Sequence, residues 1–120
     1  QRSCVTAARR AAAAKMEACF VLAGASVTHE SEYPGWAPSA VSPVRDACVA
    51  SYKKLFGVEP KVKAIHAGLE CGLFTEKFPG LDMVSFGPTL RGVHAPGVRL
   101  DLASLDKFVA LLEDVIVNYR

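Results

Sequence analysis

The sequence lacks the features that mark a nucleic-acid-binding or membrane-spanning protein. It holds 14 Lys and Arg against 12 Asp and Glu, for a formal net charge of +2, and no run of basic residues. So small a basic excess argues against an electrostatic nucleic-acid partner. No segment reaches the roughly 18 consecutive apolar residues that a transmembrane helix requires. We therefore expect no nucleic acid and no membrane among the partners.

The cysteine pattern of a zinc finger or of a disulfide framework is also missing. The four cysteines are Cys4, Cys19, Cys48 and Cys71, and none of their spacings is of the C-x-x-C type. Cys19 and Cys48 lie on apolar faces of expected helices, where a thiol usually packs as a small core residue. This usage is typical of a reduced, cytoplasmic protein rather than a secreted one.

The chain does not begin with methionine or with a signal peptide. Residues 1–7 instead read like the middle of a strand. We expect that natural sequence upstream of residue 1 has been removed. What remains is long enough for one ordinary domain, and 51% apolar residues against 22% charged ones indicate a real core rather than a disordered tail.

The first third of the chain predicts a small β-α-β piece. Residues 2–7 alternate weakly as a strand would, and the Ala-rich segment 9–22 favours a helix that Gly24 ends. Residues 25–32 alternate again. The expected apolar stripe of the helix is Ala12, Met16, Cys19, Phe20 and Ala23. Two prolines and a glycine within 33–38 then mark the clearest boundary in the sequence.

Beyond this boundary helices and strands alternate. Ser42 can cap a helix with Pro43 at its first position, and Gly57 can end it. Strands are expected at 61–65 and 83–86, with a short helix at 69–74 between them, and Asp101 can cap a last helix. The expected apolar positions are Val44, Cys48, Tyr52 and Leu55 on the first helix, and Leu105, Phe108, Leu112, Val115, Ile116 and Tyr119 on the last. The alternation predicts an α/β fold with a parallel sheet.

Two histidines follow the predicted strands 61–65 and 83–86. His66 comes directly after the first, and His94 lies in the long loop after the second. Ligands of open α/β sheets bind beyond the carboxyl ends of the strands, so both histidines should lie at one edge of the sheet. Gly68 and Gly72 bracket Glu70 at a helix start, whose backbone N–H groups can receive a carboxylate or a phosphate. Glu70 is also explained as a carboxylate favoured by the helix dipole.

Three segments resemble one enzyme family. They are Tyr-Pro-Gly-Trp at 33–36, Ile-His-Ala-Gly-Leu-Glu-Cys-Gly-Leu-Phe at 65–74, and Pro-Gly-Leu-Asp-Met-Val-Ser-Phe-Gly-Pro-Thr at 79–89. They closely resemble the aminoacyl-histidine dipeptidases, also called Xaa-His or cytosolic non-specific dipeptidases, which are di-zinc exopeptidases. The resemblance extends through His94 and the last helix and covers nearly the whole chain.

The resemblance implies that the chain is the C-terminal portion of a longer enzyme that hydrolyses Xaa-His and other dipeptides. Residues 1–33 then correspond to the end of a lid or dimerisation domain, 34–38 to the crossing, and 39–120 to the C-terminal segment of the catalytic domain, with its parallel or mixed sheet and flanking helices. The missing N-terminal part of the same protein becomes a partner. Because the chain holds only part of each domain, exposed apolar faces predict self-association or a homo-oligomer.

The family's site residues map onto few positions here. His94 matches the last metal ligand and would bind one of two zinc ions through an imidazole nitrogen. His66, Gly68, Leu69 and Glu70 match the part of the pocket that receives the substrate carboxylate. The general base and the other metal ligands should all lie upstream, so we expect no catalytic residue in this chain and no activity from it alone.

One segment departs from the family pattern. Residues 95–98 are Ala-Pro-Gly-Val where the family usually has Ser-Pro-Asp-Glu after this histidine. The change removes polar groups that can orient a metal-binding imidazole, and such groups often tune metal affinity tenfold or more. An alternative interpretation therefore stays open: a non-catalytic α/β interaction module, or a relative of the dipeptidases that has lost catalysis.

Overall fold

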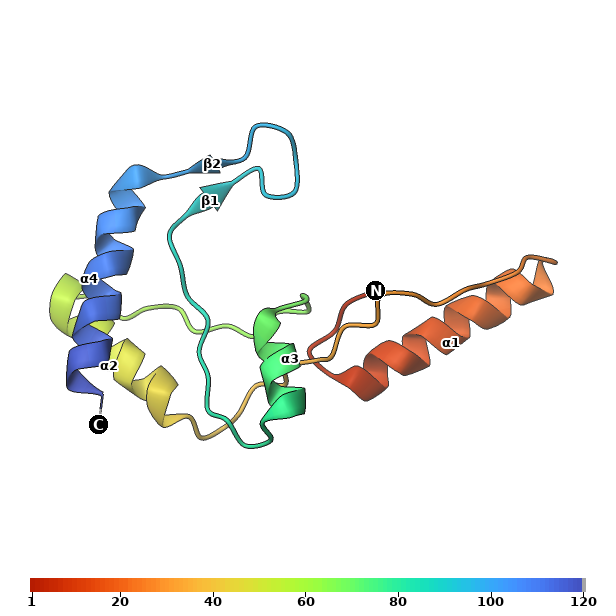
Figure 1. The fold of residues 1–120 in the computed structure, drawn as a ribbon, viewed down its shortest axis with the longest axis horizontal. Coiled ribbons are helices and arrows are strands. Elements are labelled where there is room, and N and C mark those ends of the chain that lie inside the picture. Colours follow the sequence, from red (N-terminus) through yellow and green to blue (C-terminus); the bar gives the residue numbers. More distant parts are fainter. Residues whose placement is uncertain (120) are drawn as a thin grey trace. The chain divides into compact units, whose positions relative to one another are not determined.

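The computed structural model describes residues 1–119, which fold into two compact units. The first unit comprises residues 1–40 and 62–81, and the second comprises residues 41–61 together with the chain from Asp82 onward. The helices are α1 (Thr6–Leu22), α2 (Pro43–Phe56), α3 (Glu70–Lys77) and α4 (Leu102–Asn118), and the strands are β1 (Leu90–Arg91) and β2 (Arg99–Leu100) (Figure 1). None of the helices in this range is long and apolar enough to cross a membrane.

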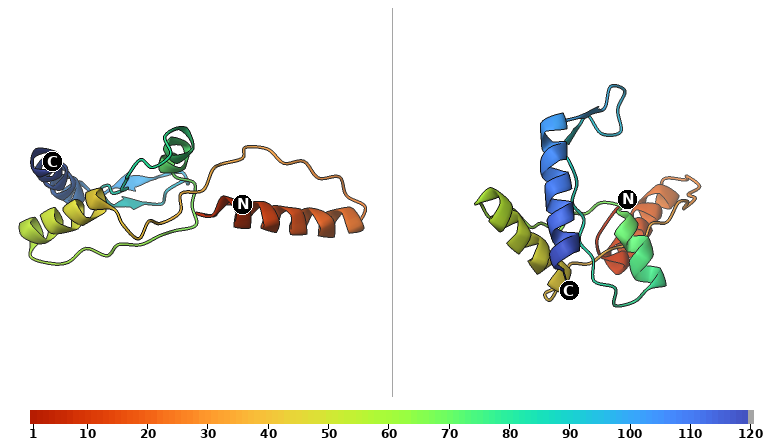
Figure 2. Two further views of the ribbon diagram at one scale, coloured as in Figure 1. Left: turned by 90° about the horizontal axis from the view of Figure 1, so that it is seen from below. Right: turned by 60° about the vertical axis from the view of Figure 1, so that its left-hand side comes forward.

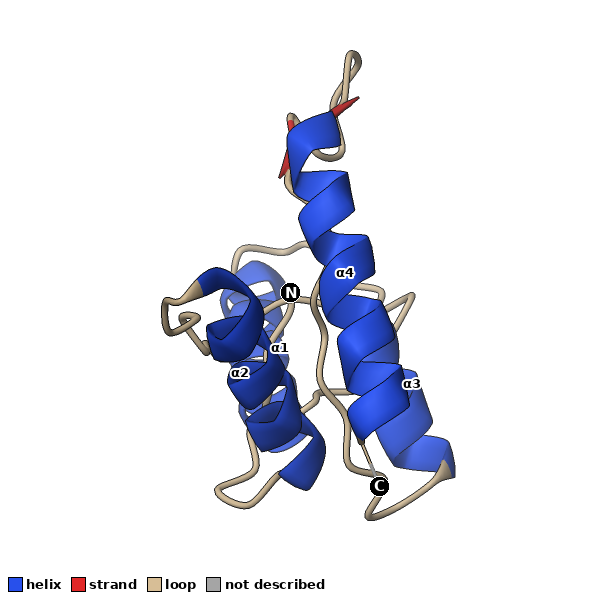
Figure 3. Ribbon diagram, turned by 90° about the vertical axis from the view of Figure 1, so that its left-hand side faces the viewer, coloured by secondary structure: helices blue, strands red, loops and turns tan. Residues whose placement is uncertain are grey.

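The core of the second unit lies between α2 and α4, which run side by side (Figures 1 and 3). Its buried residues are Cys48, Leu111 and Val115, and Tyr52, Phe56 and Val84 pack against them. Burial of Cys48 and Val115 confirms two predicted core positions. The apolar stripe predicted for the last helix, α4, is wrong toward its C-terminal end. Leu111 is buried, whereas Ile116 is 68% exposed and Tyr119 is 45% exposed.

The predicted limits of α2 are confirmed by its caps. The hydroxyl oxygen of Ser42 accepts the backbone N–H of Arg45 at 3.3 Å, and Pro43 occupies the first turn, where no intrahelical acceptor is available for an N–H. At the other end Gly57 adopts a φ of +71°, a left-handed conformation that glycine reaches without a Cβ penalty. Its N–H donates to the carbonyl oxygen of Lys53 at 2.9 Å.

An acid from outside the helix, Asp82, reinforces the start of α2. Asp82 accepts the Ser42 hydroxyl at 2.6 Å and the backbone N–H of Val44 at 2.8 Å. These hydrogen bonds, first the one from Ser42 and then the one from Val44, lower the pKa of the Asp82 carboxyl. A carboxylate at this end also interacts favourably with the positive pole of the helix. Asp82 therefore ties the extended chain that leads toward β1 to the start of α2.

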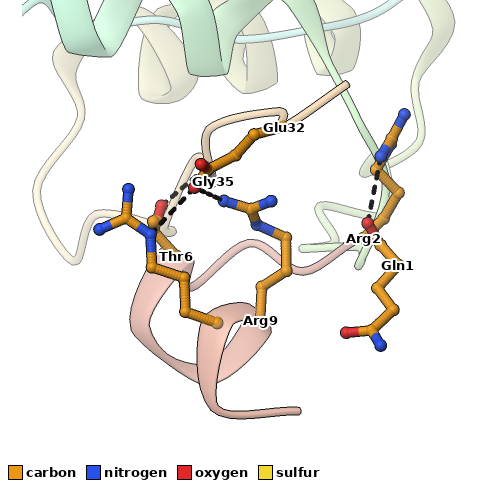
Figure 4. Close-up of polar contacts among 7 residues, drawn as sticks. Gln1, Arg2, Thr6, Arg9, Glu32 and Gly35 are labelled. Carbon is orange, nitrogen blue, oxygen red and sulfur yellow. Dashed lines mark hydrogen bonds and ion pairs between the residues drawn. The ribbon is translucent and has the colours of Figure 1, made fainter. Parts of the chain in front are cut away.

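In the first unit α1 is followed by a chain segment that returns along the helix (Figure 1). Glu32 accepts hydrogen bonds from Arg9 (Figure 4) and from Arg10. The Nε2 atom of His29 lies 3.1 Å from the Glu17 carboxylate. These contacts are polar, and α1 has no buried residue. The prediction of a packed apolar stripe on this helix is therefore wrong for residues 1–119, and Cys19 is exposed rather than part of a core.

The short helix α3 confirms the helix predicted at 69–74 and packs closely on the Pro/Gly segment. Gly72 is buried, and a Cβ built on it would lie only 2.5 Å from the carbonyl oxygen of Pro34. Gly35 makes a similar approach, because its Cβ would lie 2.6 Å from the carbonyl oxygen of Cys4. The segment predicted as a boundary thus serves as a packing surface within the first unit.

The parallel sheet is not present among the described residues. Residues 25–32, 61–65 and 83–86 form loops (Figure 3), and residues 2–7 give way to α1 from Thr6. A strand needs a neighbour about 4.8 Å away to pair its backbone groups, and none of these four segments pairs with one here. The one described strand pair is antiparallel, with Leu90 opposite Leu100. The α/β class stands only in the coarse sense of helices with a small sheet.

Candidate functional site

His66 lies at a bend directly before α3 and is exposed. Its Nδ1 atom lies 3.4 Å from the backbone nitrogen of Cys4 and 3.3 Å from the hydroxyl oxygen of Ser3. The Cys4 Sγ atom is 3.5 Å from the same ring nitrogen. These neighbours are more than 60 residues away along the sequence, so the first unit fixes His66 through its N-terminal segment.

The three other predicted substrate-binding residues surround the start of α3. Leu69 is the residue that caps the helix, without a side-chain hydrogen bond, and Glu70 is exposed in the first turn. Gly68 lies against a cation, because a Cβ on it would be 2.9 Å from the Nε atom of Arg2. The structure therefore brings Gly68, Leu69 and Glu70 together with His66 in a single loop of the first unit.

Arg2 is a neighbour of this loop that the sequence did not reveal. Its guanidinium lies over the ring of Tyr33, with 5.4 Å between the guanidinium carbon and the ring centroid, and its Nη1 donates to the carbonyl oxygen of Gln1 (Figure 4). A cation–π contact of this kind contributes about 0.5–1 kcal/mol at exposed sites. No local pattern links residue 2 to residue 68, so only the fold shows this contact.

The β1–β2 hairpin belongs to the second unit (Figure 2). His94 lies in its loop, between Arg91 and Arg99. It is exposed and has a φ of +65°, a left-handed conformation that is uncommon outside glycine. The turn is closed by the N–H of Ala95, which donates to the carbonyl oxygen of Gly92 at 3.2 Å. Gly92 and Gly97 also have positive φ values, so the loop backbone is sharply curved on both sides of the imidazole.

The base of this hairpin is fixed to the first turn of α4. Asp101 caps the helix by accepting the N–H of Ala103 at 3.1 Å, and its own N–H donates to the carbonyl oxygen of Thr89 at 3.0 Å. The N–H of Thr89 in turn donates to the Ser104 hydroxyl at 2.7 Å. The predicted cap at Asp101 is confirmed, and the same residue anchors the hairpin that carries His94.

The donor set for a metal ion is incomplete within this chain. No three His, Cys, Asp or Glu side chains in the range 1–119 are placed to share a metal ion. No hydrogen bond joins His94 to another of these residues, in keeping with the absence of polar side chains at Ala95 and Gly97. A lone imidazole suits zinc as one ligand of four, but it does not hold the ion by itself.

Cys71, next to the predicted substrate-binding residue Glu70, is not an activated nucleophile. Cys71 follows Glu70 in α3 and is partly buried. Burial raises the pKa of its thiol, and the neighbouring Glu70 charge raises it further, against a smaller lowering by a backbone hydrogen bond. A thiol with a raised pKa forms little thiolate at neutral pH. The structure therefore favours a packing role for Cys71.

Comparisons with known proteins identify relatives over almost the whole chain, although no family model matches. The chain is 37% identical over 115 residues to the cytosol non-specific dipeptidase of Escherichia coli K12. Its structure also matches the crystal structure of aminoacylhistidine dipeptidase from Vibrio alginolyticus, with a TM-score of 0.73 and 34% identity. Each alignment covers 96% of this chain and 24% of the relative.

Both relatives are named as dipeptidases, and the motifs at 33–36, 65–74 and 79–89 resemble the same kind of enzyme. The chain spans about a quarter of the length of either relative. The assignments of His66, Gly68, Leu69, Glu70 and His94 remain predictions. Over 96% of its length this chain is therefore similar to one portion of the aminoacyl-histidine and cytosol non-specific dipeptidases.

Proposed function

We propose that the chain is the C-terminal portion of a zinc-dependent dipeptidase that hydrolyses Xaa-His and other dipeptides in the cytoplasm. The observation that carries the proposal is the 37% identity over 96% of the chain to an enzyme named as a cytosol non-specific dipeptidase. A segment that covers 24% of that relative supplies part of a site rather than a whole one. Alone, the chain is therefore inactive.

His94 supplies one zinc ligand in the complete enzyme. The hairpin supports this role, because its base is hydrogen-bonded to the first turn of α4 and its loop leaves the imidazole exposed to ligands from elsewhere. The other ligands of two zinc ions, and the glutamate general base, come from the missing N-terminal part. Bound zinc supplies a water of lowered pKa and polarises the scissile carbonyl.

The loop formed by residues 66–70 receives the carboxylate end of the dipeptide. The backbone N–H groups of Glu70 and Cys71, the first two residues of α3, have no intrahelical acceptors and favour an anion, and His66 lies four residues before Glu70. In this proposal residues 1–33 end a lid domain, 34–38 cross over, and 39–120 complete the catalytic domain. The same loop positions the substrate while the zinc-bound half of the enzyme carries out the hydrolysis.

The test is zinc-dependent hydrolysis of an Xaa-His dipeptide by the longer protein that contains this chain. His94→Ala should abolish activity and lower the zinc content, whereas His29→Ala, which removes an exposed histidine bonded to Glu17, should leave both unchanged. Full activity in the His94→Ala protein would overturn the assignment. Absence of both zinc and activity in the unmutated protein would instead support the degenerate relative that Ala95 and Gly97 suggest.

A further inference from the structure

The protonation pattern of His66 follows from the groups around its Nδ1 atom. The backbone N–H of Cys4 points to this nitrogen at 3.4 Å, and a backbone N–H can only donate. Nδ1 must therefore offer its lone pair, and in the neutral imidazole the proton lies on Nε2. A proton on Nδ1 would face the Cys4 proton directly.

The Ser3 hydroxyl adds a second donor to the same lone pair. Its oxygen accepts the N–H of Val5 at 3.1 Å, which leaves the hydroxyl proton for the His66 Nδ1 atom 3.3 Å away. The Cys4 thiol, 3.5 Å from Nδ1, is compatible with this pattern because its S–H is a weak donor. Every group recorded near Nδ1 thus favours the same tautomer.

The segment that carries these donors is held in place by the Pro/Gly segment. A Cβ on Gly35 would lie 2.6 Å from the carbonyl oxygen of Cys4, so the two backbones are in close contact. The N–H of Gly35 also donates to the Thr6 hydroxyl oxygen at 2.9 Å (Figure 4). The donors on His66 are therefore attached to packed backbone rather than to a loose terminus.

We propose that Ser3 and Cys4 are positioning residues that keep the ring proton of His66 on Nε2. This inference rests on the proposed function for its consequence: the Nε2–H donates a hydrogen bond to an oxygen of the terminal carboxylate of the dipeptide. His66 then recognises the substrate by a hydrogen bond of fixed direction. Its Nδ1 lone pair is occupied, so that nitrogen does not serve as a metal ligand.

The tautomer is measured on this chain by nuclear magnetic resonance, from the ring ¹⁵N shifts of the three histidines at pH 8. His94, which has no hydrogen bond within residues 1–119, is the internal reference for an unconstrained ring. We expect His66 to show the limiting shifts of the Nε2–H form and His94 to show averaged ones. Averaged shifts at His66, or those of the Nδ1–H form, would overturn the proposal.

Variants of the donor residues separate positioning from general stability. Ser3→Ala should move the His66 shifts part of the way toward the averaged values of His94, because the Cys4 N–H still donates to Nδ1. Ser3→Thr, which keeps the hydroxyl, should restore them. Cys4→Ala retains the backbone N–H and should keep the wild-type shifts. Unchanged shifts in Ser3→Ala, with the chain still folded, would remove Ser3 from the positioning role.

Kinetics of the longer enzyme test the consequence for the substrate. Ser3→Ala removes the hydrogen bond between the Ser3 hydroxyl and the His66 Nδ1 atom. We expect it to raise KM for an Xaa-His dipeptide about three- to tenfold, with kcat nearly unchanged. His66→Gln, whose amide N–H can donate near the position of Nε2, should raise KM less than His66→Asn does. A shifted tautomer with an unchanged KM contradicts the substrate contact, whereas an inactive unmutated enzyme contradicts only the proposed function.

Discussion

Gly72 has no side-chain carbon, and this allows α3 to pack closely against the backbone of Pro34. Its hypothetical Cβ would lie 2.5 Å from the carbonyl oxygen of Pro34, a backbone atom that cannot move aside cheaply. We predict that Gly72→Ala destabilises the first unit by about 1–3 kcal/mol, measured by urea unfolding. Gly87→Ala is the matched control, because nothing lies within 4 Å of the added methyl there. Equal stability of the two variants would show that α3 does not pack on Pro34.

At the residue scale, helix caps could be predicted from the sequence, whereas contacts between residues far apart in the sequence could not. Caps at Ser42, Gly57 and Asp101 were predictable because each acts within three or four residues of its own position. Contacts such as Arg2 with Gly68 or Cys4 with His66 join segments about 60 residues apart. No periodicity encodes such pairs, so the surroundings of His66 could not be derived before the fold was known.

The Ser42 side chain makes two hydrogen bonds at the start of α2. Ser42 both accepts the Arg45 N–H and donates to Asp82, so Ser42→Ala removes two hydrogen bonds at once. We predict a loss of about 0.5–2 kcal/mol in the free energy of unfolding, measured by urea denaturation. Ser85→Ala, at an exposed position outside any helix, should change it by less than about 0.5 kcal/mol. A neutral Ser42→Ala would show that Asp82 caps the helix without Ser42.

Acid should weaken the contacts of α2 and α4 that depend on carboxylates with lowered pKa values. Hydrogen bonds from Ser42 and Val44 lower the pKa of Asp82, and hydrogen bonds from Lys54 and Ser51 lower that of Asp114, which links α4 to α2. A lowered native pKa favours the ionised form, so its stabilisation is complete above the ordinary value of 3.8 and is lost as pH falls through the native pKa.

The melting temperature followed from pH 7 to pH 2 measures this loss. We expect a plateau above about pH 5 and a fall below about pH 4. Asp82→Asn should flatten part of that fall, because the amide does not titrate. Glu59→Gln, at an exposed position, should leave the curve unchanged. A fall of the same size in Asp82→Asn would assign the acid sensitivity to other groups.

At the scale of elements, helices were predictable and strands were not. A helix satisfies its backbone within its own segment, so propensity and caps near residues 43–56 and 102–118 suffice to predict it. A strand depends on a partner, and the segments 25–32, 61–65 and 83–86 pair with none among residues 1–119. Their alternating or apolar composition was a correct observation, but it does not create a sheet by itself.

At the scale of the whole molecule the exposed apolar surface is large. Side chains on α1 and α4 that would normally be covered are open to solvent, among them Phe20 at 53%, Leu22 at 88% and Val117 at 71%. We predict that the isolated chain self-associates with rising concentration, measured by light scattering. Replacing Phe20 and Leu22 by Ser should reduce the association, whereas Thr28→Ser, at an exposed polar position, should not. A monomer at high concentration would contradict the prediction.

The Pro/Gly segment is the part of the predicted domain organisation on which the structure bears. The Pro/Gly segment 33–38 was predicted as a crossing, and it lies in the first compact unit, where Pro34 and Gly35 pack against Gly72 and Cys4. The assignment of residues 1–33 to a lid and of 39–120 to a catalytic segment rests on the family resemblance and stays a prediction.

The measurement that tests the central claim most directly is Xaa-His dipeptide hydrolysis with added zinc, by this chain and by the longer protein that contains it, side by side. The account predicts activity in the longer protein alone, with the chain inactive because it brings a single candidate ligand, His94, to the metal. Activity in the isolated chain, or its absence from a correctly folded and zinc-supplied longer protein, would contradict the account.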